Sequence, residues 1–99
     1  MTQKENIELL NKSWEPGGFL DGIHEGIFDR QLFNELYQSL QAIQIDDHEN
    51  IERELIKLLW FIPIFMHRFK EYVTGISSEE YDGLREDIEE QLARIFGYP

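Results

Sequence analysis

The side chains with the clearest chemical potential are the three histidines, His24, His48 and His67, which lie far apart in the sequence. A helical metal site needs ligands four residues apart, and only carboxylates stand at that spacing from a histidine here. His48 follows Asp46 and Asp47, but a calcium loop has a longer ordered pattern of ligands. We therefore expect His48 to lie in a solvated helix cap. His67 ends an apolar run, and we expect it to hydrogen-bond a neighbouring helix.

The hydroxyl and carboxylate side chains form no pattern typical of catalysis. A nucleophilic serine needs an adjacent base and an orienting acid, and none of the four serines stands in a glycine-bracketed elbow. Carboxylates are so numerous that no single pair can be assigned as acid and base. No glycine-rich loop follows a strand, so no phosphate cradle is evident. The sequence predicts a protein that is not an enzyme and binds no cofactor or metal.

The positions of the acidic residues are more informative. In the last predicted helix, four carboxylates follow the spacing i, i+3, i+7 and i+10, which places them on one ridge: Glu79, Asp82, Glu86 and Glu89. Like charges at this spacing destabilise a helix by a few tenths of a kcal/mol per pair. We expect pairs of Arg85 with Glu89 and of Glu90 with Arg94 to offset part of that repulsion.

A second acidic cluster precedes the third predicted helix and comprises Asp46, Asp47, Glu49, Glu52 and Glu54. An ordinary solvated face, with acids favoured by the helix dipole, is one interpretation of both clusters. The other is a partner-binding surface, which we favour because the acids persist beyond the first turn, where the dipole no longer favours them. The predicted partner-binding residues are Glu79, Asp82, Glu86, Glu89, Asp46, Asp47 and Glu49.

Composition narrows the class of partner. The 99 residues suffice for one domain, predicted to span residues 1–99, and they carry 20 acids against nine bases, a net charge of −11. Such a surface repels nucleic acid and attracts a basic protein, although it also serves solubility. The chain has no cysteine and no apolar signal segment near its start, so the cytoplasm is the expected location.

The element that must position these surfaces is the apolar stretch Leu58–Phe69. It is far shorter than the roughly 20 residues that a membrane-spanning helix needs, so we expect no membrane association. We predict a central helix from Glu49 to Thr74, kinked at Pro63 and stopped by Gly75. Leu59, Ile62 and Phe65 should be buried, and a second apolar face of Trp60, Phe61 and Ile64 should pack on another neighbour.

Three further helices complete a predicted all-α fold, a compact bundle of about four helices around the central hydrophobic helix. Thr2 with Glu5 forms a capping box for the first helix, Asp29 caps a second over Arg30–Ile45, and Ser77 with Glu80 opens the last. We expect no sheet. The segment Trp14–Gly26 is predicted to be a loop, with its apolar residues Phe19, Leu20 and Ile23 tucked against the core.

The early part of the chain resembles a known family. Leu9, Leu10, Trp14, Glu15 and Pro16, followed by the amphipathic stretch Leu32–Leu40, are similar to a Leu-rich turn, Trp-x-x-Pro-like segment and helix in some immunity proteins of bacterial toxin systems, including contact-dependent growth inhibition. The resemblance covers about a third of the chain. It implies a one-to-one inhibitor that covers the active site of a cognate toxin, often a basic nuclease.

Two functional hypotheses follow. The first is a non-catalytic inhibitor that docks on a basic protein through its acidic surface, because opposite charges speed encounter and fix orientation. The alternative is a small all-α structural or assembly subunit that self-associates through exposed aromatic side chains. The sequence leaves the oligomeric state open between them.

Overall fold

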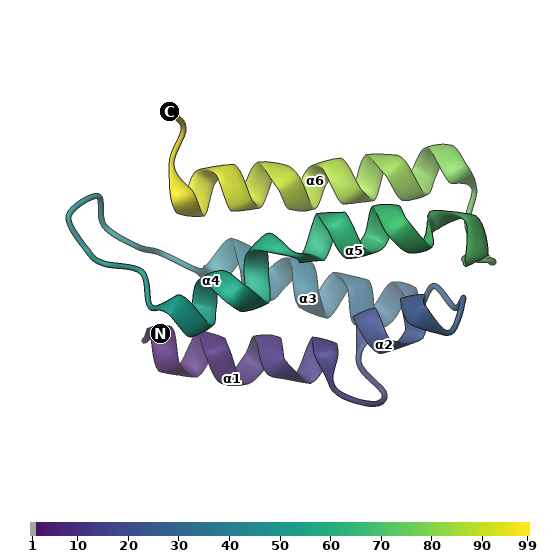
Figure 1. Ribbon diagram of the computed structural model, residues 1–99, viewed down its shortest axis with the longest axis horizontal. Helices are drawn as coiled ribbons and strands as arrows, with labels where there is room; N and C mark the ends of the chain where they lie inside the picture. The colour runs from purple at the N-terminus through teal and green to yellow at the C-terminus, as the bar shows by residue number, and fades with distance from the viewer. Residues whose placement is uncertain (1) are drawn as a thin grey trace.

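The computed structural model describes residues 2–99, and within them the protein is all-α, as predicted. The helices are α1 (Gln3–Trp14), α2 (Phe19–His24), α3 (Arg30–Ala42), α4 (Arg53–Trp60), α5 (Ile62–Phe69) and α6 (Ser78–Phe96), with a 3₁₀ turn η1 (Lys70–Tyr72). In Figure 1, α5 runs between α6 and α2, and α3 lies behind it. Among the described residues, extended pairing is limited to one isolated bridge between Ile27 and Thr74.

The predicted helix starts are confirmed for three helices. The Glu5 N–H donates to Thr2 Oγ1 at 3.2 Å while Glu5 Oε1 accepts from the Thr2 N–H at 3.1 Å, a complete capping box. The hydrogen bond from the Thr2 backbone also lowers the pKa of Glu5. Asp29 accepts from the Leu32 N–H at 3.0 Å, and Ser77 accepts from the Glu80 N–H at 3.1 Å.

The reciprocal half of the Ser77 capping box does not form. Instead, the Glu80 carboxylate lies 3.0 Å from Arg30 Nη1 and links the start of α6 to the start of α3. The Glu80 carboxylate, which the local capping pattern assigned to the Ser77 backbone, therefore pairs with Arg30, a cation distant in the sequence.

The segment Trp14–Gly26 contains a helix where a loop was predicted. Its glycines provide the tight turns on either side of α2: Gly26 has φ +83°, and a Cβ on Gly18 would lie 2.1 Å from the Lys12 carbonyl oxygen. The prediction that the apolar residues tuck in is confirmed, because Phe19, Leu20 and Ile23 are buried. Six residues are too few for a stable isolated helix, so packing on the core stabilises α2.

The central helix differs from its prediction at both ends and in the middle. It begins at Arg53, beyond the first acidic residues of the loop, and its α-helical part ends at Phe69. The kink expected at Pro63 is a break between α4 and α5 at Phe61, because the proline cannot donate to the preceding turn. The preceding helix, α3, also ends early, at Ala42.

The core forms one cluster of buried apolar residues drawn from all six α-helices and the segment after α3. Leu59 and Ile62 are fully buried as predicted, whereas Phe65 is only half-buried. The second apolar face is also more exposed than predicted, since 49% of Trp60 is accessible. Phe65 meets Trp14 edge to face at a centroid distance of 5.2 Å and also contacts the rings of Phe61 and Phe69, so neighbouring aromatic rings cover it only in part.

Candidate partner-binding surfaces

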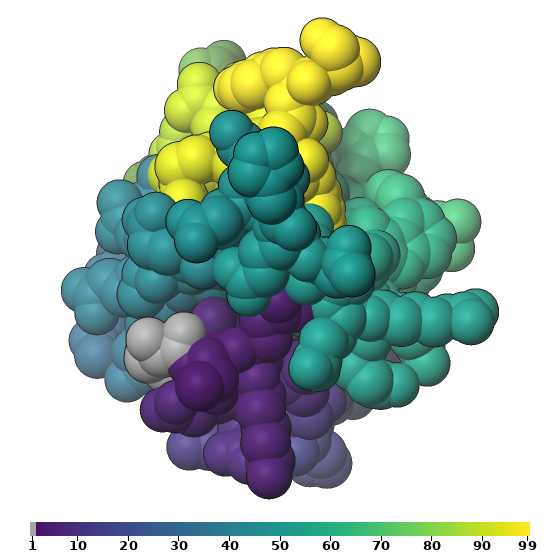
Figure 2. Space-filling view, turned by 90° about the vertical axis from the view of Figure 1, so that its left-hand side faces the viewer, coloured from purple at the N-terminus to yellow at the C-terminus, as the bar shows by residue number. Residues whose placement is uncertain are grey.

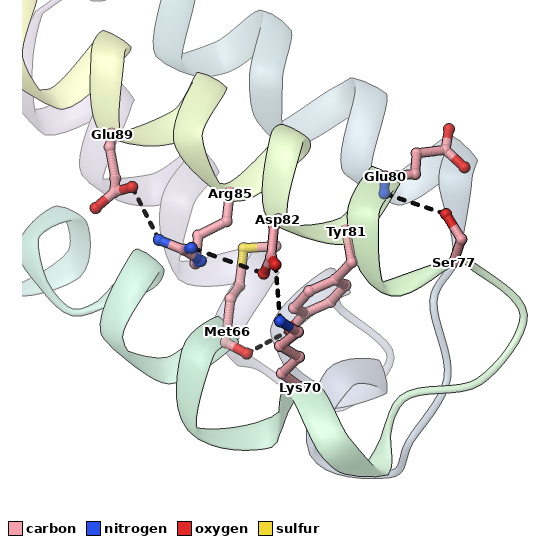
Figure 3. A network of polar contacts seen from close by, with 8 residues as sticks. All are labelled: Met66, Lys70, Ser77, Glu80, Tyr81, Asp82, Arg85 and Glu89. Carbon is pink, nitrogen blue, oxygen red and sulfur yellow. Dashed lines mark hydrogen bonds and ion pairs between the residues drawn. The ribbon is translucent and has the colours of Figure 1, made fainter.

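The predicted acidic ridge of α6 divides into two groups with different surroundings. Asp82 and Glu89 lie on the side of the helix that faces α5, and Figure 3 shows both turned toward cations on that side. Glu79 and Glu86 lie on the side opposite the buried residues Tyr81, Ile88 and Leu92, and both are exposed. At 3.6 residues per turn, positions i and i+7 lie in one column of the helix surface and positions i+3 and i+10 lie about 60° away in the next, so the two pairs meet different neighbours.

Asp82 is held by two cations. Its Oδ2 accepts a hydrogen bond from Lys70 Nζ at 2.7 Å, and its Oδ1 lies 3.7 Å from Arg85 Nη2 (Figure 3). The hydrogen bond from Lys70, followed by the charges of Lys70 and Arg85, holds the pKa of Asp82 below its ordinary value of 3.8. Asp82 therefore joins α6 to the end of α5 and serves the fold directly.

Glu89 completes the same network. Arg85 Nη1 donates to Glu89 Oε1 at 2.9 Å, which confirms the predicted intrahelical pair. The Arg85 side chain is 18% exposed and lies between the two carboxylates.

A buried hydrogen bond also joins α6 to α5. The Tyr81 hydroxyl donates to the Met66 carbonyl oxygen at 2.5 Å, and burial raises the pKa of Tyr81 to about 12.

The second predicted pair, Glu90 with Arg94, does not form. The Arg94 guanidinium donates to the carbonyl oxygens of Leu40 and Ile43, at 2.9 Å each. These groups stand at the C-terminal end of α3, where carbonyls lack helical partners and the dipole favours a cation. Arg94 therefore caps α3 from a distance of about fifty residues in sequence, and Glu90 stays exposed.

The remaining carboxylates of α6 form what we call the acidic face: Glu79, Glu86, Asp87 and Glu90. All four are exposed, and none is ion-paired within residues 2–99. Gly83 lies among them and has open space where a Cβ would stand. Sequence reasoning included Glu79 and Glu86 but missed Asp87 and Glu90, because the latter was assigned to Arg94.

The second acidic cluster lies in the connection between α3 and α4. Figure 2 shows this connection in teal, crossing one end of the molecule between the start of α1 in purple and the end of α6 in yellow. Gln3 fastens it: its amide donates to Glu49 Oε2 at 2.9 Å and accepts from the Glu52 N–H at 2.7 Å. Asp46 and Asp47 remain exposed. Glu49 thus contributes to the loop structure, whereas the side chains of the two aspartates make no ion pair within the described residues.

The three histidines are not brought together. All three are exposed, and His24 Nδ1 lies 3.6 Å from Glu25 Oε1. The expectation that His67 hydrogen-bonds a neighbouring helix is wrong, because its side chain points to solvent at the outer side of α5. In the part of the chain that the structure describes, no three acidic or histidine side chains are grouped as a metal site would require.

An aromatic surface was not singled out by the sequence as a site. Rings follow one another in contact from Trp14 through Phe61, Phe65 and Phe69 to Tyr72, with centroid distances between 4.7 and 6.3 Å. Tyr72, at one end of this series, is 70% exposed, whereas the other four rings are partly buried. Exposed aromatic side chains of this kind are typical of protein contact surfaces.

The chain matches no family model, no curated protein and no solved structure. The resemblance to toxin immunity proteins therefore stays a prediction. None of the described helices combines the length and the apolar character needed to cross a bilayer.

Proposed function

We propose that this is a non-catalytic binding protein, an immunity- or antitoxin-like inhibitor that acts in the cytoplasm by one-to-one docking on a basic toxin. The observation that supports it is the acidic face of α6. Its four carboxylates are exposed and make no ion pair within the described chain, while the neighbouring Asp82 and Glu89 are each ion-paired with a cation of the fold.

The geometry of the acidic face suits a basic partner. Glu79 and Glu90 are eleven residues apart on one helix, which corresponds to about 16 Å. A row of that length can face several cations of a partner at once, such as those that line a nuclease's phosphate-binding groove. The carboxylates of the acidic face repel one another in the free protein, and the cations of a partner relieve this repulsion. The relief makes the free energy of binding more favourable.

The charge balance adds long-range attraction. With a net charge of −11, the protein attracts a basic partner before contact and accelerates encounter. Asp46 and Asp47 extend the negative surface to one end of the molecule and form the second candidate contact.

The test replaces Glu79, Glu86 and Glu90 with glutamine and measures association with the partner captured by pull-down from the native cell. Rim charges act mainly on encounter, so the association rate at low salt should fall several-fold and its salt dependence should flatten. The free variant should be as stable as the wild type or slightly more so, because repulsion is removed and glutamine is a good helix former.

A matched control removes the same number of charges elsewhere. Glu8, Glu15 and Glu35 are exposed and lie on or beside α1 and α3, and their triple glutamine variant changes the net charge equally. The proposal requires the α6 variant to lose more than the control. Equal losses of association rate in the two triple variants would mean that only net charge matters. A loss of association rate confined to an Asp46→Asn/Asp47→Asn variant would place the contact at the α3–α4 connection instead.

The alternative function, an assembly subunit acting through self-association, is favoured by a different observation. Trp60 and Tyr72 are large and exposed, and they lie at the two ends of α5, away from the acidic face.

A further inference from the structure

The outward side of α4, α5 and η1 carries a row of five side chains, which we call the outer row: Lys57, Trp60, Ile64, Arg68 and Glu71. The row stands opposite the buried residues Leu59, Ile62 and Met66. Ile64 is half-buried and the other four are exposed. Phe61 keeps right-handed helical backbone angles, so the row continues from α4 into α5. Glu71 follows in the 3₁₀ turn, beyond Phe69, whose angles of φ −99° and ψ 4° depart from the α-helix.

The spacing of the outer row is symmetric. Counted along the chain, the intervals are three, four, four and three residues, with Ile64 at the centre. A two-fold axis through Ile64, with two copies antiparallel, would therefore place each member opposite another member of the row. Residues 57 and 64, in α4 and α5, also keep the seven-residue period with which helices pack along one seam.

Each pair formed by this symmetry is complementary. Lys57 of one copy faces Glu71 of the other, which joins opposite charges. Trp60 faces Arg68, a cation–π pair. Ile64 faces Ile64, an apolar contact on the axis. We propose that the outer row is the contact surface for a second copy of this chain, in an antiparallel two-fold arrangement centred on Ile64.

Within one copy these groups have weak partners. The Arg68 guanidinium lies 5.3 Å above the Phe61 ring, and no carboxylate pairs with it in the described residues. Lys57 Nζ lies 3.7 Å from Glu54 Oε1, and both side chains are more than 60% exposed. By contrast, the cations Lys70, Arg85 and Arg94 are engaged inside the fold. Lys4, Lys12 and Arg53 likewise make no ion pair in the described residues, so the cations of the outer row are distinguished by their symmetric register with an acid and an aromatic ring of the same row.

Size and charge set the strength of this contact. One helix face buries less than the roughly 1,200–2,000 Å² of a stable complex, so a weak dimer is expected. Two copies of net charge −11 repel each other at long range, and added salt screens that repulsion. Salt also weakens the two exposed Lys57–Glu71 pairs, but exposed pairs contribute little, so relief of the repulsion between the two net charges dominates and self-association should tighten as salt rises. Binding of a basic partner through the acidic face of α6 has the opposite salt dependence, so the two contacts are separable.

The experiment is sedimentation equilibrium of the whole chain at about 0.02 M and about 0.3 M salt. A monomer–dimer equilibrium with more dimer at high salt is expected. Ile64→Asp places two carboxylates together on the axis and should weaken the dimer more than about tenfold. The matched control is Ile27→Asp, which adds the same charge at a 58% exposed isoleucine between α2 and α3 and should leave the dimer unchanged.

Charge reversal tests the register. Lys57→Glu and Glu71→Lys should each weaken the dimer, and the double variant should restore it, because each copy again presents opposite charges to the other at wild-type net charge. Thermal melts confirm that the variants fold. A monomer at every concentration, a dimer indifferent to Ile64→Asp, or a double variant without recovery would overturn the proposal.

Discussion

On the side of α6 that faces α5, Asp82 and Glu89 are held by Lys70 and Arg85, whereas on the acidic face Glu79 and Glu86 meet no cation in the described chain. All four belong to one helix, and their spacing suggested one common role. The difference shows that a carboxylate's role depends on what lies across from it. On the inner side the carboxylates are part of the fold, and on the outer side they are exposed and make no ion pair within the described residues.

The largest stability effect should come from the inner side, at Tyr81. Tyr81→Phe leaves the buried carbonyl of Met66 without its donor and should cost about 1–3 kcal/mol in the free energy of unfolding. A urea melt at neutral pH measures this loss. A change within error would mean that water replaces the hydroxyl and that the inner side is less enclosed than its burial indicates.

The pH dependence of the same residue sharpens the test. The pKa of Tyr81 rises to about 12 in the folded protein, while an unfolded tyrosine titrates near 10. The neutral phenol is thus favoured by folding: the contribution is complete below about pH 10 and is lost as pH rises toward about 12. Tyr81→Phe should lose less stability over that interval than the wild type.

The next effect contrasts the two sides directly. Asp82→Asn should lower the urea midpoint at pH 7, because it removes the anion between Lys70 and Arg85. Glu86→Gln, on the acidic face, should leave the midpoint unchanged or raise it slightly. Equal responses would break the distinction between the two sides.

Acid titration separates the charge of Asp82 from its packing. Its folded pKa lies below the ordinary value of 3.8, so its contribution is present above about pH 4 and is lost as pH falls through the folded pKa. The difference in stability between Asp82→Asn and wild type should therefore shrink in strong acid. A difference that persists unchanged below that range would assign the effect to packing.

The smallest effect should be a gain on the outer side. Gly83 lies inside α6, and a Cβ added there would meet no neighbouring atom within 4 Å, so nothing opposes a side chain. Gly83→Ala should stabilise the protein by about 0.4–1 kcal/mol through reduced freedom of the unfolded chain. Thermal melts measure it, and destabilisation would show that the acidic face is covered in the free protein.

Local patterns predicted much of the fold. The capping residues Thr2, Asp29 and Ser77 each hydrogen-bond the helix start that the sequence assigned to them. These bonds join residues three apart, so the local spacing predicts them, whereas the Glu80 carboxylate, at the same spacing, pairs with Arg30 on another helix. Predictions that depended on distant neighbours were less accurate: α2 was missed because a six-residue helix is stabilised by the core, and Phe65 was placed deeper than it lies.

The sequence by itself determined an all-α chain with a central apolar segment, a large excess of acids and an acidic last helix, because composition and helical period are properties of the chain alone. Only the tertiary structure decided which acids are engaged. Lys70 reaches Asp82 from the end of α5, and Arg94 leaves Glu90 for the carbonyls of α3. Intrahelical spacing specifies neighbours on the same helix, whereas these partners belong to other elements, and only packing brings them within bonding distance.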